Sequence, residues 1–127
     1  MPSKRQRRVA EQIHQILAEL IQFEAEDPRL DGVTVMDVLI DRELMVATVY
    51  VNSLRGEESQ KDVMDGLGRA TGFLRYELGR RVQLQNTPEL RFKWDESLET
   101  GARIDALIAS LHKTEADEQA ESADDPD

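Results

Sequence analysis

The stretch GLGRATGFLRYELGRR, residues 66–81, carries residue types that suit phosphate chemistry: glycines allow close backbone approach, and arginines pair with phosphate. Gly66, Gly68 and Gly72 approach the Gly-x-Gly-x-x-Gly pattern of dinucleotide-binding turns, but the last spacing is one residue too long. The preceding residues, QKDVMD, have a helical rather than a strand pattern. A Walker loop ends in Gly-Lys-Ser/Thr, whereas Phe73 follows Gly72. Spacing and context therefore exclude both nucleotide-binding patterns.

The same stretch predicts two helices joined at a kink. Each glycine inside a helix costs about 1 kcal/mol relative to alanine, so a kink near Ala70-Thr71-Gly72 is expected. The second helix would present its N-terminal amides there, a suitable seat for a phosphate or an RNA backbone. Arg69 and Arg75 flank this seat. The alternative is that the glycines only allow close packing of helix on sheet.

The charge of the chain is unevenly distributed. The net charge is -10, but the last thirteen residues hold seven acids and no base, which leaves 19 acids and 16 bases in residues 1–114. Phosphate binding needs a local positive patch rather than a positive total, so nucleic acid stays a candidate partner. The alternative is that the bases only keep the surface solvated. The candidate phosphate-binding bases are Lys4, Arg5, Arg7, Arg8, Arg69, Arg75, Arg80, Arg81, Arg91 and Lys93.

Apolar periodicity predicts an α+β fold in which helices cover one face of a three-stranded sheet. Met36, Val38 and Ile40 should share the inward face of one strand, while Asp37 points outward. Residues 1–112 form the expected domain, and residues 113–127 are expected to be a disordered acidic tail. The predicted elements are a helix at about 4–25, strands at 33–40 and 44–51, a helix pair from Ser59 to about Val82, a strand at 89–95 and a last helix from Ser97.

Catalytic and metal-binding patterns are weak. The chain has no cysteine, which excludes disulfides and thiolate chemistry, and its histidines, His14 and His112, stand alone. We therefore expect no enzyme activity, no cofactor and no metal. No apolar run approaches the roughly 20 residues of a membrane span, and the charged N-terminus is unlike a signal peptide. A soluble, cytoplasmic monomer is expected.

Four stretches together resemble the bacterial ribosome-binding factor A family, over about residues 5–111. They are RRVAEQIHQILAELI with DPRL, VTVMDVLIDRELMVATVYV, GLGRATGFLRYELGRRVQL and TPELRFKWDESLETGARIDALI. The resemblance implies a type II KH-like domain of order α-β-β-α-α-β, followed here by a last helix. KH domains clamp nucleic acid with a Gly-x-x-Gly loop, which this chain lacks. The family instead carries an Ala-x-Gly kink, and Ala70-Thr71-Gly72 stands at its place.

The resemblance also implies a function. The family binds the small (30S) ribosomal subunit during late assembly and assists 16S rRNA maturation without catalysis, and a ribosome-assembly GTPase is associated with its release. Gln85 departs from the family, which often has arginine there. We expect Arg69, Arg75, Arg80 and Arg81 to contact phosphates around the kink. The alternative function is a protein–protein adaptor that uses the sheet edge and the acidic tail.

Overall fold

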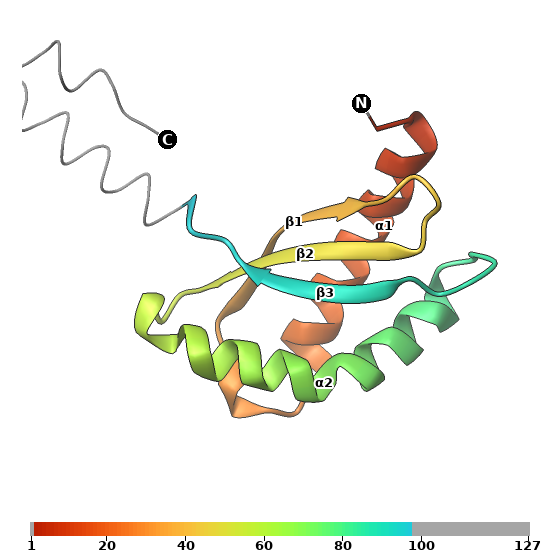
Figure 1. Ribbon diagram of the computed structural model, residues 1–127. Coiled ribbons are helices and arrows are strands. Elements are labelled where there is room, and N and C mark those ends of the chain that lie inside the picture. Colours follow the sequence, from red (N-terminus) through yellow and green to blue (C-terminus); the bar gives the residue numbers. More distant parts are fainter. Residues whose placement is uncertain (1, 98–127) are drawn as a thin grey trace, which may run out of the picture. The chain divides into compact units, whose positions relative to one another are not determined.

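The computed structural model describes residues 2–97, and up to Asp95 they form one compact unit. The body of the expected last helix and the acidic tail lie outside the described residues. The unit is a mixed α+β fold with a three-stranded sheet, as the sequence predicts (Figure 1). No helix in this part of the chain is long and apolar enough to cross a membrane.

The first helix, α1 (Lys4–Glu19), begins at the expected residue and ends before the expected end at about residue 25. Ser3 caps it: its hydroxyl accepts from the Gln6 amide at 3.1 Å, and the Gln6 side chain accepts from the Ser3 amide at 2.9 Å. A π-helical turn, η1 (Leu20–Glu24), extends α1 to within one residue of the predicted end. The chain then turns at η2 (Pro28–Leu30), a short 3₁₀ helix with proline in its first turn.

The sheet has the strand order β1-β2-β3. Strands β1 (Val33–Ile40) and β2 (Val46–Ser53) pair antiparallel, and β3 (Glu89–Trp94) pairs parallel to β2. Helix α1 packs on β1, and the second helix packs on β3 and contacts α1. Both helices therefore cover the same face of the sheet (Figure 1).

The inward face of β1 differs from the prediction at one residue. The register shifts between Val35 and Asp37, so a β-bulge at Met36 changes which side chains face the helices. Val35 is buried and Met36 is only half-buried. The prediction of Met36 as an inward residue is wrong because it assumed strict alternation along the whole strand. Val38 and Ile40 are buried and Asp37 is exposed, as predicted.

The loop between β1 and β2 is longer than predicted, because β2 begins at Val46. Leu44 adopts a left-handed backbone (φ 59°) with its side chain buried. The Asp41 carboxylate accepts from the amides of Met45 (2.7 Å) and Val46 (2.9 Å). These hydrogen bonds lower the pKa of Asp41, the Val46 bond most strongly. Asp41 therefore holds the loop in shape.

The segment predicted as two helices is one α-helix, α2 (Gln60–Arg81). Its inward side chains Val63, Leu67, Leu74 and Leu78 are fully buried, so packing outweighs the helix-weakening effect of its glycines. The Thr71 hydroxyl donates to the Leu67 carbonyl at 2.8 Å, a contact that often bends helices. The ribbon of α2 changes direction in its middle part (Figure 1).

The turn after α1 generates a pH prediction. Asp27 accepts from the Arg29 guanidinium at 2.6 Å and from the Arg29 amide at 2.9 Å, which lowers the pKa of Asp27 from 3.8 to about 2. A carboxyl with a depressed folded-state pKa stabilises the fold above its unfolded pKa and loses that effect as pH falls. Asp27→Ala should therefore lower the melting temperature at pH 7, and its difference from wild type should shrink between pH 3.8 and about 2. A pH-independent difference would contradict this role of Asp27.

Candidate nucleic-acid interface

The four glycines of α2 divide into two pairs. An added Cβ at Gly66 would lie 3.1 Å from Leu30 Cδ2 and 3.3 Å from Arg29 Cβ, and one at Gly79 would lie 2.6 Å from Thr87 Oγ1. These two glycines allow neighbouring elements to pack closely. At Gly68 and Gly72 an added Cβ would meet nothing within 4 Å. Close internal packing therefore explains one pair, while the other pair leaves the backbone open to approach from outside.

Arg75 ties α2 to the turn before β3. Its guanidinium donates to the Pro88 carbonyl at 3.1 Å and to the Thr87 carbonyl at 2.7 Å. Two of its N–H donors are thus used in hydrogen bonds within the protein. Its positive charge has no carboxylate partner among the ion pairs of the described residues. Arg75 is a positioning residue as well as a predicted phosphate contact.

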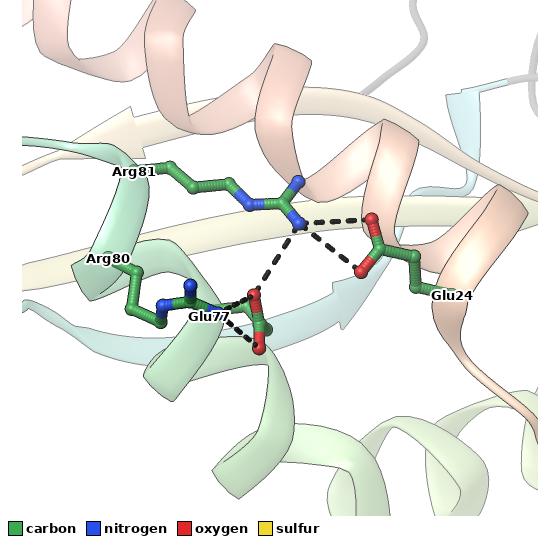
Figure 2. A network of polar contacts seen from close by, with 4 residues as sticks. All are labelled: Glu24, Glu77, Arg80 and Arg81. Atoms are coloured by element: carbon green, nitrogen blue, oxygen red, sulfur yellow. Dashed lines mark hydrogen bonds and ion pairs between the residues drawn. The ribbon is translucent and has the colours of Figure 1, made fainter.

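Arg81 and Arg80 belong to a network at the C-terminal end of α2 (Figure 2). The Arg81 guanidinium donates to the two Glu24 oxygens at 3.2 and 3.0 Å and to Glu77 at 3.4 Å. The Glu24 bond is the main cause of the raised pKa of Arg81. Arg80 makes only long contacts with Glu77, at 3.3 and 3.4 Å, and its guanidinium lies 6.0 Å from the Tyr76 ring centroid. The network joins η1 to α2, and it engages Arg81 more fully than Arg80.

Arg91 and Lys93 lie on a different surface from the bases of α2. On β3 the inward side chains are Leu90, Phe92 and Trp94, as predicted, so Arg91 and Lys93 point to the face that α1 and α2 do not cover. Arg91 pairs with Glu89 at 2.9 Å, while Lys93 has no ion-pair partner in the described part of the chain. The structure therefore separates these two bases from the helical ones.

The N-terminal basic cluster occupies the start of α1. Lys4, Arg5, Arg7 and Arg8 are all exposed, and Arg7 donates to the Pro2 carbonyl at 3.1 Å. The first turn of α1 holds no acid, although the helix dipole favours acids and disfavours cations there. The cluster therefore does not stabilise its own helix, which leaves its charge available to an anionic partner.

Arg69 is the exposed base nearest the middle of α2, and it makes no ion pair with the described residues. It lines a hollow of about 400 Å³, which we call the Arg69 hollow, with Ala70 and Phe73 of α2, with Glu24 at the end of η1, and with the following residues Ala25, Glu26 and Asp27. Ala70 and Thr71 are half-buried, and Gly72 is exposed. Of the predicted Ala-x-Gly residues, only Gly72 is thus exposed.

Sequence reasoning missed Tyr76, which is 67% exposed on α2. Its four-residue spacing from both Gly72 and Arg80 places the three on one helix face, and this signal was present in the sequence. His14 needs no functional role, because its Nε2 lies 2.9 Å from the Val35 carbonyl oxygen. Within residues 2–97 no group of three or more His, Asp or Glu is arranged to hold a metal ion.

The profile of the family described as Ribosome-binding factor A matches residues 5–108. The chain belongs to the ribosome-binding factor A family. Ribosome-binding factor A of Azoarcus sp. (strain BH72) is 50% identical over 104 residues, which cover 82% of either chain. The factor of Aromatoleum aromaticum is 44% identical over 123 residues, 97% of this chain and 94% of that one.

Solved structures of the family share the fold. The crystal structure of ribosome-binding factor A from Thermus thermophilus superposes with a TM-score of 0.62 at 36% identity, over 69% of this chain and 93% of that one. A homology model of the Thermus thermophilus factor, fitted into the cryo-EM map of a 30S–RbfA complex, gives a TM-score of 0.57 at 37% identity, over 68% and 91% of the two chains.

The division of the glycines generates a stability prediction. Gly72→Ala should raise the free energy of unfolding by about 0.5–1 kcal/mol, because alanine favours the helix and meets no neighbour there. Gly66→Ala should raise it by less, because the new methyl group lies 3.1 Å from Leu30 Cδ2 and 3.3 Å from Arg29 Cβ and so offsets part of the helix gain. Urea denaturation measures both values. Equal gains at the two positions would contradict the assignment of Gly66 to close packing.

Proposed function

We propose that this chain binds the small ribosomal subunit during late assembly and assists 16S rRNA maturation, without making or breaking a bond. The observation that carries the proposal is the similarity to the homology model of the Thermus thermophilus factor that was fitted into the cryo-EM map of a 30S–RbfA complex, at 37% identity over 91% of that chain. In this proposal the chain acts as a cytoplasmic monomer that needs no cofactor. A ribosome-assembly GTPase is associated with its release.

The outward side of α2 is the proposed rRNA contact. The exposed backbone at Gly68 and Gly72 allows an RNA strand to approach closely, and Arg69 and Arg80 lie along the same helix. Both arginines are exposed. The contacts of Arg80 with Glu77 are long, and the Arg80 side chain is 62% exposed, so a phosphate can replace Glu77 as its partner. Arg75 and Arg81 support this surface, because they fix α2 to the 87–88 turn and to Glu24.

Binding of this kind acts through differential affinity. A protein that contacts one rRNA conformation better than another shifts the population toward the first. Phosphate contacts carry little sequence information, so the selection depends mainly on RNA shape. In late assembly the conformation of the rRNA is still changing, so a shift in the population of its conformations can promote maturation.

Charge reversal tests the surface. Arg69→Glu combined with Arg80→Glu should weaken binding to immature small subunits and lower the slope of log K against log salt by about one unit per lost contact. Arg42→Glu, an exposed arginine in the β1–β2 loop, is the matched control and should leave the slope unchanged. Co-sedimentation across a salt series measures both.

Two outcomes would count against the proposal. Unchanged binding by the double variant would remove Arg69 and Arg80 from the interface. Association of the wild-type chain that survives high salt and nuclease treatment would instead favour the protein–protein adaptor.

A further inference from the structure

A second hollow, of about 490 Å³, lies along the C-terminal half of α2. Its lining residues are Gly72, Arg75, Tyr76, Gly79, Arg80 and Thr87. We call it the Tyr76 hollow. It is lined by two arginines and no carboxylate. Three other hollows on the described surface do include acids. The Arg69 hollow holds Glu24, Glu26 and Asp27; a second holds Glu43 beside Arg5, and a third holds Asp31 beside Leu54. The lining of the Tyr76 hollow therefore suits an anionic ligand better than the linings of these three hollows do.

Tyr76 is an exposed aromatic surface within this hollow. Its side chain is 67% exposed, and the Arg80 guanidinium lies 6.0 Å from the ring centroid. The hydrophobic core of the described residues is complete without this ring. An exposed tyrosine flanked by arginine is a surface on which a nucleobase stacks well, because every base offers a π-face.

The walls of the hollow are held in place before any ligand binds. Arg75 fixes the carbonyls of Thr87 and Pro88 with two hydrogen bonds, and Gly79 allows Thr87 to lie against α2. Gly72 adds no side chain at the opposite end, where an added Cβ would meet nothing within 4 Å. A pre-formed site loses less entropy on binding than one that must be ordered.

We propose that the Tyr76 hollow binds an unpaired RNA base, which stacks on the Tyr76 ring while Arg80 contacts the adjoining phosphate. This proposal rests on the proposed rRNA-binding function and specifies which kind of RNA the surface takes. A base within a duplex is already stacked on its neighbours, so only a single-stranded or looped-out base can lie on the ring. The Arg80 side chain is 62% exposed, which leaves it accessible to that phosphate.

Binding of a short unstructured RNA of mixed sequence, compared with a duplex of the same length, tests this subsite by fluorescence anisotropy. Tyr76→Ala should weaken single-strand binding by about 5- to 150-fold, the range that loss of one base–aromatic stack produces. Tyr76→Phe keeps the ring and should retain the affinity. Phe23→Ala is the matched control, because Phe23 is 74% exposed yet does not line the hollow, and it should have no effect.

Duplex binding should be the same for wild type and Tyr76→Ala, and the melting temperature of Tyr76→Ala should not fall, because the ring is exposed. The subsite is overturned if Tyr76→Ala binds single-stranded RNA like wild type, or if the wild type does not bind it. It is also overturned if the variant loses affinity only for whole subunits, which would indicate a ribosomal protein on the ring. These results leave the proposed function standing, whereas failure of the wild-type chain to bind immature subunits would refute that function itself.

Discussion

The parallel pairing of β2 with β3 is the constraint on which the rest of this structure depends. Two parallel neighbours cannot be joined by a tight turn, so the chain between them must cross one face of the sheet. Helix α2 makes this crossing, and its inward residues Leu67 and Leu74 are fully buried against the core. The crossing leaves the opposite side of α2 exposed, with Gly68, Gly72 and Tyr76 on it. The proposed RNA surface is therefore the outer side of a structurally required helix.

Internal partners decide which bases remain available on that surface. Arg81 is held by Glu24 and Glu77, and Arg75 by two backbone carbonyls, so both fix α2 relative to its neighbours. Arg69 makes no ion pair with the described residues and Arg80 makes only long contacts with Glu77, so most of their N–H donors remain available to bind an external anion. A count of arginines along the helix would overestimate the number of phosphate contacts, because part of the charge already stabilises the geometry of the site.

Local patterns in the sequence predicted the features that depend only on residues close together in the chain, such as strand orientation and helix start. The alternation of Leu90, Phe92 and Trp94 fixed the orientation of β3, and Ser3 marked the start of α1. The β-bulge at Met36 was missed because alternation alone contains no signal for an extra residue. The Arg81–Glu24 pair joins residues 57 positions apart, and the different surroundings of Gly66 and Gly72 depend on which element packs there. Such features arise from tertiary packing, which the one-dimensional pattern does not contain.

The central claim is that the outward side of α2, and not the uncovered face of the sheet, lies against rRNA. The chain has no cysteine, so a single cysteine can carry a tethered hydroxyl-radical source at a chosen position. Gly68→Cys places the source on α2, and Leu39→Cys places it on the uncovered sheet face, where Leu39 is 51% exposed. With each variant bound to immature small subunits, we predict strong 16S rRNA cleavage from position 68 and weak cleavage from position 39. Strong cleavage from position 39 with none from position 68 would contradict the account.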